Sequence, residues 1–480
     1  MDDRKVDGSN AVYTSEIFKV QARRSRRRGS RGSILEPARE ITVVDEVDVL
    51  VAGGGPAGTA AAIAAARTGA RTLLVERHNH LGGLATGGLV IWIDRMTDWD
   101  GRRVIRGLAE EILDRLPADA VHGPAPGEWG SREPGRVARW GPRHSAFHGI
   151  VTLAPMTDPE WMKQVKATMV RESGAELLLH AWIARPLVED GRVAGAFLES
   201  KQGRLAVRAR CVVDTTGDAD LLVQAGAAHD EDIDEGSIHH CMNVAWLWGG
   251  VDMERWLDFA AGDPEGHRAF LAEGRAQLGL FEKPMSSWRN DVAVFMGPRY
   301  SGFSAVSLED LNAVEALSRD KLFEMLDFYR RRAPGFERAW VMLTAPQMGV
   351  RHSRRARGLA GVSAADWKAG LVHADEIGVS PSLNPRFASV SVPYRALVPA
   401  GVEGLLVAGR HVACDATSHG FMREIPQCWM TGQAAGTAAA LSVASGVAPA
   451  ALDVATLRDA LERQGVHLHA PPGSATAAEG

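Results

Sequence analysis

The sequence predicts an α/β protein whose main domain is built on a parallel β-sheet. Three observations support this fold class. An apolar run at residues 47–51 predicts a buried strand, and a glycine-rich turn follows it at residues 53–58. After the turn, an alanine-rich segment predicts a helix that packs closely on the strand, and a second apolar run at residues 72–75 predicts the next strand. This order of strand, turn, helix and strand is typical of units that bind dinucleotides.

The glycines of the turn are spaced as phosphate binding requires. Gly53 permits the tight turn, Gly55 lets the backbone approach a pyrophosphate, and Gly58 allows close contact between helix and strand. The helix N-terminus adds free N–H groups and the positive end of its dipole. Glu76 ends the second strand, where its carboxylate can accept hydrogen bonds from ribose hydroxyls. The segment therefore predicts a bound dinucleotide.

Composition excludes several classes of protein. The 480 residues are 45% apolar and carry a formal net charge of −5, which does not support nucleic-acid binding. The four cysteines form no CxxC pair, so neither a disulfide framework nor a thiol redox centre is expected, and a reducing cytoplasm fits. No uninterrupted apolar stretch reaches transmembrane length. We expect a cytoplasmic protein that does not bind a membrane.

Further glycine-rich turns follow along the chain. Residues 80–88 hold four glycines in nine residues, which predicts a loop close to something flat or charged. Residues 177–182 and 192–197 predict paired strands around a turn at 189–191. Residues 209–218 form another apolar run that ends in a glycine turn. A last strand at 404–409 leads through a loop to a helix of small residues that begins near Thr431.

Together these segments resemble the FAD-dependent oxidoreductase family with the glutathione-reductase-type fold, over roughly residues 43 to 465. The matching pieces occur in order: GGGPAG with Glu76 and Arg77, LGG with ATGG, VVDTTGDADL, APQMGVRHSRRARG, VPYRALVP, and LLVAGR with GQAAGTAAA. The resemblance implies a Rossmann-like FAD-binding domain, at residues 41–235 and 390–465, with an inserted α+β substrate or cap domain at residues 236–389. We expect a disordered basic arm at residues 1–40 and a flexible tail at 466–480.

The same resemblance implies which residues contact FAD. It also implies that the helix near Thr431 directs its N-terminus at the flavin. Arg410 stands where related flavoproteins often have an acid, and we expect it to contact a phosphate or the substrate. The expected cofactor-binding residues are Gly53, Gly55, Pro56, Ala57, Gly58, Glu76, Arg77, Gly82, Gly83, Thr86, Thr216, Gly217, Asp218, Gly409, Arg410 and Gln433.

FAD is expected to be held noncovalently. In fumarate-reductase relatives with covalent flavin, a histidine lies six residues before a Gly-Gly pair that corresponds to Gly87 and Gly88. This chain has Leu81 at that position, and His80 is one residue away.

The segment from His419 to Arg423 is similar to the HGxxR segment of soluble fumarate reductases, whose arginine binds a substrate carboxylate beside the flavin. A guanidinium offers a rigid, charged fork to such a group, and histidine moves protons near neutral pH. His419, Arg423 and Arg351 are the catalytic candidates. Two structural alternatives remain open: Arg423 caps a helix while His419 satisfies carbonyls, or the cationic run at residues 351–357 is a solvated face.

Other side chains suggest weaker hypotheses. Tryptophans near residues 90–150, with His144 and His148, suggest an aromatic-walled substrate pocket. Tyr394 is expected to be a packed residue with a hydrogen-bonded hydroxyl group. Residues 236–251 predict a strand that enters the substrate domain, and adjacent residues of a strand point to opposite faces, which argues against a metal site at His239, His240 and Cys241. No metal is expected.

The predicted activity is hydride transfer between FAD and a C–C or C–N bond of a small molecule, as in a dehydrogenase, desaturase or reductase. O2 or NAD(P)H is the expected electron partner, because the chain has one dinucleotide fingerprint and no CxxxxC pair. Two alternatives remain open. The first is a flavin-dependent monooxygenase, whose usual motifs differ from residues 218–221 and 409–411. The second is a non-catalytic or RNA-modifying flavoprotein, suggested only by the basic arm. The sequence does not predict the oligomeric state.

Overall fold

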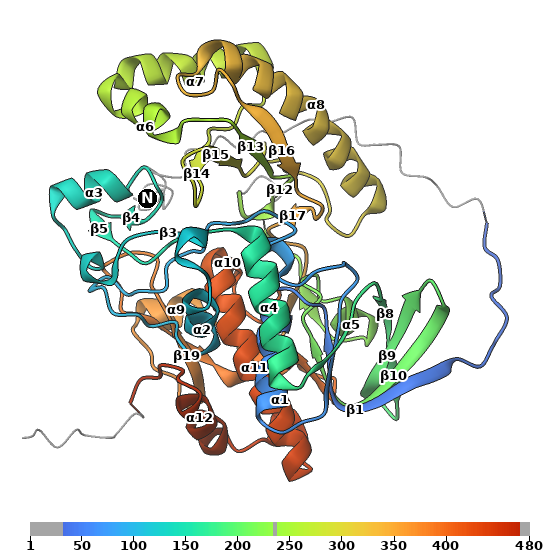
Figure 1. Ribbon diagram of the computed structural model, residues 1–480. Helices are drawn as coiled ribbons and strands as arrows, with labels where there is room; N and C mark the ends of the chain where they lie inside the picture. The colour runs from blue at the N-terminus through green and yellow to red at the C-terminus, as the bar shows by residue number, and fades with distance from the viewer. Residues whose placement is uncertain (1–31, 234–237, 471–480) are drawn as a thin grey trace, which may run out of the picture.

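The computed structural model describes residues 32–233 and 238–470 (Figure 1). Its largest sheet has seven strands in the order β7-β2-β1-β10-β9-β8, and β21 pairs with β10 beside this path. The strands are β1 (Thr42–Ala52), β2 (Thr72–Val75), β7 (Glu176–Leu178), β8 (Trp182–Glu189), β9 (Arg192–Ser200), β10 (Gly203–Asp214) and β21 (Leu405–Val407).

Four parallel strands of this sheet end together. In the pairing register, Ala52 lies opposite both Val75 and Asp214, and Asp214 lies opposite Val407. Each of these residues is the last of its strand. Ligands of open α/β sheets bind at the carboxyl ends of the strands. The predicted α/β fold with a parallel, Rossmann-like sheet is therefore confirmed, and this edge is where the cofactor is expected.

The hairpin predicted around residues 189–191 is also confirmed. Strands β8 and β9 are antiparallel, and Asp190 and Gly191 both have positive φ, of 49° and 78°. Residues 177 and 178, which we expected to extend the hairpin, instead belong to β7 and pair with β2.

Two helices of small residues pack on the sheet with very little space between them. A Cβ added at Gly432 or Gly436 of α11 would lie 2.1 or 2.0 Å from a carbonyl oxygen of α1. These glycines therefore allow the two backbones to approach closely. The helices lie side by side at the centre of the molecule, with α4 next to α1 (Figure 1). Their bounds are α1 (Pro56–Arg67), α4 (Pro159–Ser173) and α11 (Ile425–Ser445).

The start of α11 corrects a prediction. We expected the helix to begin near Thr431, but it begins at Ile425. Pro426 lies in its first turn, where its missing N–H costs nothing. Thr431 is a mid-helix residue whose hydroxyl donates to the carbonyl of Gln427 at 2.8 Å.

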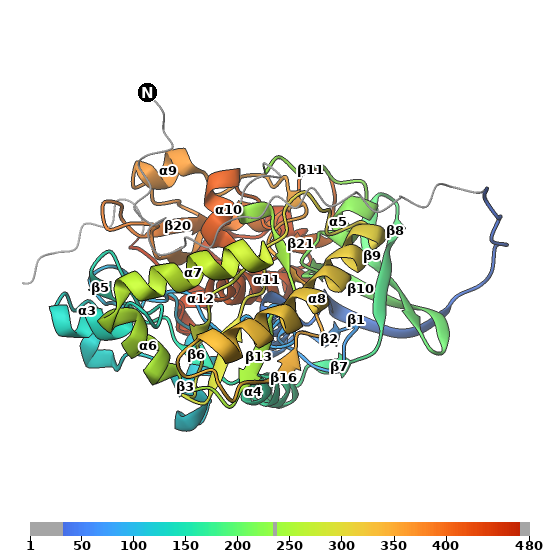
Figure 2. The same cartoon turned by 90° about the horizontal axis from the view of Figure 1, so that it is seen from above.

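A second sheet and three helices form a cap over one end of the body (Figures 1 and 2). The sheet order is β14-β15-β13-β16, all antiparallel. Its core is rich in aromatic side chains, among them Trp246, Trp248 and Phe295, which are fully buried. The elements are β13 (Trp246–Gly249), β14 (Met285–Ser286), β15 (Val292–Phe295), β16 (Trp340–Thr344), α6 (Met253–Gly262), α7 (Pro264–Leu278) and α8 (Leu308–Arg332).

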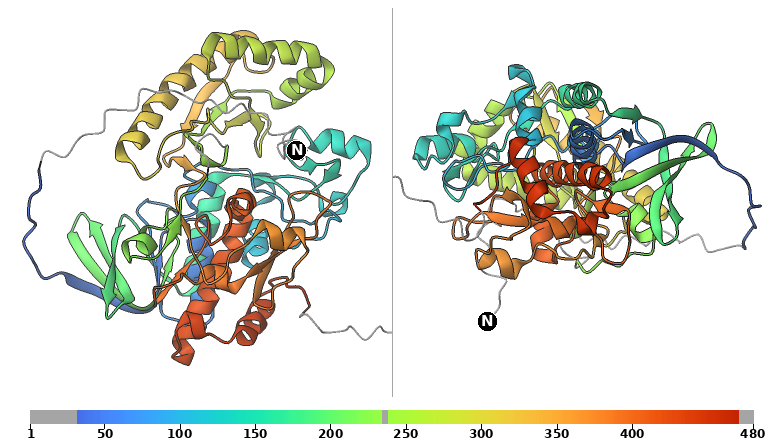
Figure 3. Two further views of the ribbon diagram at one scale, coloured as in Figure 1. Left: turned by 180° about the vertical axis from the view of Figure 1, so that it is seen from behind. Right: turned by 90° about the horizontal axis from the view of Figure 1, so that it is seen from below.

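The remaining elements are short. From below, the red C-terminal helices lie at the centre of the body (Figure 3). The short strand pairs are β3 (Val121–His122) with β6 (Met156–Thr157), β4 (Ala146–Phe147) with β5 (Ile150–Val151), β11 (His229–Asp230) with β18 (Arg355–Ala356), β12 (Met242–Asn243) with β17 (Gly349–Val350), and β19 (Glu376–Ser380) with β20 (Val390–Pro393). The other helices are α2 (Leu108–Asp114), α3 (Pro134–Trp140), α5 (Asp220–Gln224), α9 (Ala364–Lys368), α10 (Ala416–Met422) and α12 (Val454–Arg463).

Several segments differ from their expected place. Trp367 and Ile377, within the segment expected to form the cap, pack in the core of the larger sheet. Residues 466–470, within the expected flexible tail, are packed, and His469 Nδ1 lies 2.7 Å from Glu376 Oε1. Instead of one strand, residues 238–249 form a 3-10 turn followed by β12 and β13. Residues 1–31 of the arm expected at 1–40, and residues 471–480 of the tail, lie outside the described residues.

Tyr394 is packed as expected: it is buried, and its hydroxyl donates to the carbonyl of Pro449 at 2.9 Å. The four cysteines are free and buried. In the part of the chain that the structure describes, no helix is long and apolar enough to cross a membrane. The same residues include no group of three or more metal-ligating side chains that could hold an ion.

Candidate cofactor and substrate site

One cavity of about 990 Å³ begins at the glycine turn after β1 and extends beneath the cap. Its lining includes Gly53 and Gly55 from the turn, Thr216 from the end of β10, Trp92 from the segment after the glycine loop, and Arg351 after β17. The cavity therefore joins the expected dinucleotide site to side chains from the cap region.

The glycines of the turn act as the sequence suggested. Gly53 has φ of 105°, and a Cβ there would lie 2.8 Å from the carbonyl oxygen of Thr215. A Cβ at Gly58 would lie 1.7 Å from the carbonyl oxygen of Gly53, so this residue serves contact between helix and strand and does not line the cavity. Around the Cβ position of Gly55, by contrast, no described atom lies within 4 Å. Gly55 therefore leaves space for a ligand.

Glu76 lines the cavity next to this turn. Its Oε2 accepts a hydrogen bond from the Gly54 N–H at 2.7 Å, and its Oε1 accepts one from the His78 N–H at 2.8 Å. A carboxylate offers about four acceptor sites, so these two bonds fix the side chain and leave capacity for ribose hydroxyls. Arg77 lies over the ring of Trp182 at 4.6 Å from its centroid, and both line the cavity.

A network of hydrogen bonds holds the end of β10. Asp214 accepts from Thr216 and from the N–H groups of Leu221 and Leu222. Arg410 forms three hydrogen bonds: it donates to the carbonyls of Gly217 and Val350, both at 2.8 Å, and to Asp218 Oδ1 at 2.6 Å. Arg410 thus ties two strands to the loop that follows β10. Because it also lines the cavity, its contact with a phosphate or the substrate stays a prediction.

The charge of Asp218 is stabilised by the same network. Burial opposes its ionisation, but the Arg410 guanidinium and a hydrogen bond from Ser353 hold the pKa of this carboxyl below its usual value. Gly217, Asp218, Gly409 and Arg410 all line the cavity.

Some expected site residues lie elsewhere. Thr86 is fully buried and donates to the carbonyl of Leu81, and Gly82 packs against Thr86. Gln433 faces away from the cavity, because its Oε1 accepts from the Leu108 N–H at 2.9 Å and its amide donates to Gln464. Gly83, next to Gly82, does line the cavity, as do Pro56 and Ala57.

His419 is not at the cavity wall. It is fully buried, and its Nε2 lies 3.2 Å from the carbonyl oxygen of Arg410. Burial, reinforced by Arg423 and His352, lowers the pKa of His419 well below 6.5. This geometry agrees with the structural alternative for His419, in which its ring satisfies a backbone carbonyl. Its neighbours Thr417 and Gly420 line the cavity in its place.

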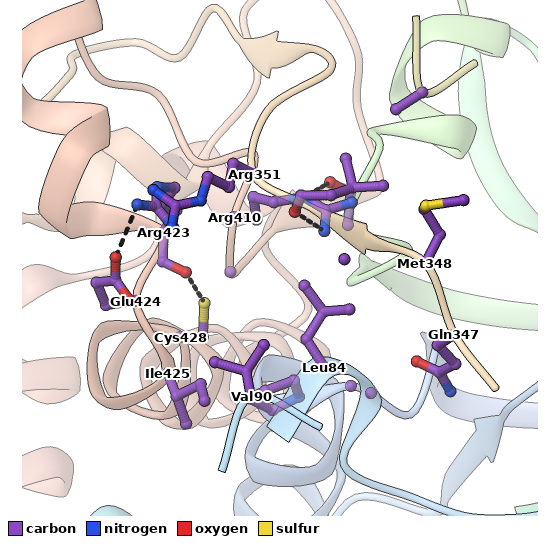
Figure 4. Close-up of a pocket in the computed structure, with 18 of the residues that line it drawn as sticks. Leu84, Val90, Gln347, Met348, Arg351, Arg410, Arg423, Glu424, Ile425 and Cys428 are labelled. Atoms are coloured by element: carbon purple, nitrogen blue, oxygen red, sulfur yellow. Dashed lines mark hydrogen bonds and ion pairs between the residues drawn. The ribbon is translucent and has the colours of Figure 1, made fainter. Parts of the chain in front are cut away.

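Arg351 and Arg423 lie together at one end of the cavity, above a floor of Leu84, Val90 and Ile425 (Figure 4). Arg423 forms an ion pair with Glu424 at 2.9 Å, immediately before α11. Burial lowers the pKa of Arg351, and the charges of Arg299 and Arg423 lower it further. An arginine nevertheless remains charged at neutral pH.

The rest of the cationic run at residues 351–357 is not a solvated face. Arg354 pairs with Asp220 at 2.6 Å, and the fully buried Arg355 pairs with Asp232. Only Arg357, paired with Asp230, is mostly exposed among these arginines. The run therefore divides into one cavity-facing residue, Arg351, and a set of structural ion pairs.

An aromatic wall lies on another side of the cavity. Trp92 is 6.3 Å from the ring of His144 and 6.2 Å from that of Phe147, measured between centroids, and all three line the cavity. Trp99 and His148, at 5.2 Å from one another, continue the wall. Trp246 and Trp248 are not part of this wall, because they belong to the cap core.

FAD fits the residues at the strand ends. Helix α1 begins at Pro56 without a side-chain cap from any described residue, so its first N–H groups are available to a pyrophosphate. The open space at Gly55 admits the phosphates, and the fixed Glu76 carboxylate is placed for a ribose. The residues that would hold the cofactor are Gly53, Gly55, Ala57, Glu76, Thr216, Gly217 and Gly409.

Sequence relatives include enzymes with several activities. A digeranylgeranylglycerophospholipid reductase of Methanopyrus kandleri is 30% identical over 176 residues, which are 36% of this chain and 38% of the relative. A thiamine thiazole synthase of Aeropyrum pernix is 33% identical over 184 residues, which are 35% of this chain and 54% of the relative. The chain thus matches about two fifths and about half of the lengths of these two proteins.

Solved structures with a similar course of the chain are distant. A geranylgeranyl bacteriochlorophyll reductase-like protein from Thermoplasma acidophilum has a TM-score of 0.45 and 16% identity, with 87% of this chain and 83% of that chain covered. A p-nitrophenol 4-monooxygenase from Pseudomonas putida has a TM-score of 0.45 and 12% identity, with 87% and 84% covered.

The family assignment rests on a match over most of the chain. Residues 48–461 match the family described as FAD dependent oxidoreductase. This range contains the glycine turn, Glu76, the network around Asp218, and Arg351 and Arg423. The chain is therefore an FAD-dependent enzyme, and it belongs to the FAD-dependent oxidoreductase family.

Proposed function

We propose that this enzyme transfers hydride between FAD and a C–C or C–N bond of a small molecule. The observation that carries the proposal is one continuous cavity, which joins the cofactor cradle at Gly53–Ala57 to Arg351 and Arg423. A substrate in the arginine end of this cavity would lie beside the N-terminus of α11. When bound, FAD supplies the hydride chemistry, and the protein supplies binding, orientation and electrostatics.

The role proposed for Arg423 is to stabilise negative charge that develops on the substrate. The side chain is 12% exposed, and the Glu424 carboxylate holds it at the N-terminus of α11. Donors that are fixed before the reaction act most strongly where water is excluded. Arg351 is proposed to bind the substrate beside Arg423, and the positive end of the α11 dipole adds to the same field.

His419 is proposed to be a positioning residue. Its Nε2 contact with the Arg410 carbonyl supports the strand end that carries Gly409, and its ring lies 4.9 Å from that of His352. If it only orients this loop, His419→Ala should lower turnover without changing the pH at which the rate falls. If the pH dependence of the rate shifts in His419→Ala, His419 acts as a proton donor instead.

Stopped-flow spectroscopy tests the proposed reaction. The purified protein should release FAD and not FMN, and one class in a panel of candidate substrates, or NAD(P)H, should change the flavin absorbance in a single turnover. If no member of a broad panel reacts while O2-dependent hydroxylation of an added compound is found, the enzyme is a monooxygenase and the hydride-transfer proposal is wrong.

Two substitutions test Arg423. Arg423→Ala should slow the single-turnover rate roughly 100-fold, corresponding to about 3 kcal/mol of transition-state stabilisation. Arg423→Lys retains the charge but not the fork, so its rate should be intermediate. FAD content should be unchanged in both variants. Wild-type rates in Arg423→Ala, or loss of FAD in place of activity, would assign Arg423 a structural role.

The cofactor is proposed to be noncovalent and the enzyme cytoplasmic. Leu81 occupies the position of the flavin-linked histidine in covalent relatives, and His80 is not among the residues that line the cavity. Acid precipitation should therefore release the yellow colour into solution. Colour that stays with the pellet and maps to His80 would contradict noncovalent binding.

A further inference from the structure

Another arginine, Arg299, lines the same cavity beside Arg351. The short strand β12 brings the two together, because Met242 pairs with Val350 on one side and forms a bridge to Tyr300 on the other. Arg299 and Arg351 each stand one residue from these partners, so they flank the same position of β12 although they are far apart in the chain.

Neither guanidinium forms an ion pair with a carboxylate of the described residues. Arg299 is 6% exposed, and its Nε and Nη1 atoms are buried without a hydrogen-bond partner among residues 32–233 and 238–470. Among the residues that the structure describes, no carboxylate lies within 4.0 Å of the guanidinium of Arg299 or Arg351. A buried charge without a partner is strongly destabilising, and buried charges in proteins are normally paired. These atoms line a cavity, which indicates that a ligand supplies the missing acceptor.

The surroundings limit the charge of that ligand. Glu282 is close enough to feel the charges of Arg299, Lys283 and Arg351, and Glu424 is paired with Arg423. Even with both carboxylates ionised, the cations Arg299, Arg351, Arg423 and Lys283 outnumber them, so this end of the cavity favours an anionic ligand. A planar carboxylate also matches the guanidinium fork.

The surroundings also limit the body of the ligand. Arg299 lies near enough to His144 to affect its charge, and His144 belongs to the aromatic wall with Trp92 and Phe147. Such a wall favours an aromatic or otherwise flat apolar group. The carboxylate and the flat group would thus occupy adjoining parts of the cavity.

We propose that Arg299 and Arg351 bind the carboxylate of an aromatic acid, which is the substrate class of this enzyme. This inference rests on the proposed function, since it assigns the substrate of the same cavity.

The test uses the FAD-loaded enzyme and three probes, and it needs no turnover. Benzoate, its neutral isostere benzamide and the smaller acetate are titrated by calorimetry and by the change in flavin absorbance. We expect benzoate to bind at least 10-fold more tightly than either of the others. Inorganic phosphate and phenyl phosphate form a further arm, and tighter binding of either than of benzoate would overturn the assignment to a carboxylate.

Arg299→Met provides the decisive variant, with Arg289→Met as its matched control. Arg289 also lies by the cap sheet, but it is exposed and paired with Asp291 at 2.8 Å. Arg299→Met should weaken benzoate binding at least 10-fold and leave benzamide binding unchanged. Because it removes an unpaired buried charge, it should also keep or raise the melting temperature of the ligand-free protein. Arg289→Met should change neither quantity.

Each remaining outcome decides between binding and structural roles. If Arg299→Met lowers the melting temperature and leaves benzoate affinity intact, Arg299 is structural and the inference is wrong. Should that variant fail to fold, Arg351→Met with the same probes replaces it, and unchanged benzoate affinity there would overturn the proposal equally. Failure of the proposed function would look different, because it would appear as no flavin reduction by any substrate while carboxylate binding persists.

Discussion

The two ends of the central cavity satisfy their polar groups in different ways. At the cofactor end, Glu76, Asp214, Asp218 and Arg410 are held by hydrogen bonds from the protein itself. At the other end, Arg299 and Arg351 reach the cavity without an ion-pair partner in the described chain. The polar side chains of the cofactor end are thus fixed by hydrogen bonds within the protein. At the other end, guanidinium groups still need an acceptor.

This difference separates what binds permanently from what binds transiently. A rigid cradle with all its side chains fixed suits a resident cofactor, because little ordering remains to be done on binding. Buried arginines without an ion-pair partner make the empty state less stable, which suits a ligand that enters and leaves in each turnover. Four predictions follow this contrast from the largest expected effect to the smallest.

The largest effect is expected at Gly58, at the cofactor end. In Gly58→Ala the new Cβ would lie 1.7 Å from the Gly53 carbonyl oxygen, so α1 must move away from β1. Overpacking of this kind costs about 3 kcal/mol or more when the backbone cannot yield. We expect apoprotein melting to fall by several degrees and FAD binding to be lost, measured by thermal unfolding and by flavin fluorescence.

Gly55→Ala is the matched change on the cavity side of the same turn. No described atom lies within 4 Å of its Cβ position, so the apoprotein should keep its melting temperature. The added methyl group would occupy space that the cofactor needs, and FAD affinity should fall at least 10-fold by titration. Equal FAD affinity in this variant and the wild type would show that the phosphates do not lie against Gly55.

Lys166 tests whether a buried cation without an ion-pair partner, placed away from the cavity, lowers the stability of the fold without serving ligand binding. It is fully buried in α4, its Nζ has no hydrogen-bond partner among described residues, and it lies 4.9 Å from the centroid of the Trp429 ring. Burial lowers its pKa to about 7. Lys166→Met should therefore stabilise the protein, by about 1–4 kcal/mol, without changing FAD content or benzoate binding.

The pH dependence of this gain has a definite sign. Because the folded-state pKa of Lys166 is lowered, the folded protein binds fewer protons than the unfolded chain above about pH 7. Wild-type stability should then rise toward that of Lys166→Met as pH increases from about 7 to 10, and the gap should be widest below pH 7. Lys163→Met is the control in the same helix, since Lys163 is paired with Glu160 at 2.7 Å and should contribute under about 1 kcal/mol.

The cofactor end could be predicted from sequence because its determinants are local. Gly53, Gly55 and Gly58 belong to one short turn, and Glu76 follows at the end of the next strand, so spacing alone carries the geometry. The arginine end could be predicted only in part. Arg351 and Arg423 were suggested by family resemblance, but Arg299 follows no motif and reaches the site only through the pairing of β12 with distant segments.

The errors also have physical reasons. His419 and Gln433 were assigned from their motifs, which do not determine which way a side chain points, and both are turned toward backbone groups of the protein. The early start of α11 could have been predicted from Pro426, because proline is favoured in a first helical turn. The predicted start near Thr431 rested instead on the alanine and glycine run that follows this residue.

The smallest effect is expected for an ion pair that is satisfied and remote from the cavity. Glu376 is fully buried, and both its oxygens accept hydrogen bonds from His469. Oε2 accepts from the backbone N–H at 2.6 Å, and Oε1 accepts from the ring Nδ1 at 2.7 Å. The hydrogen bond to Glu376 raises the pKa of His469. The stabilisation is therefore complete below the ordinary histidine pKa near 6.5 and is lost as pH rises through the raised value.

Since the side chain of His469 is 31% exposed, we expect His469→Ala to cost on the order of 1 kcal/mol or less. The loss in melting temperature should be greater at pH 5.5 than at pH 8.5, whereas a loss that is equal at both values would mean that packing, and not charge, holds this segment.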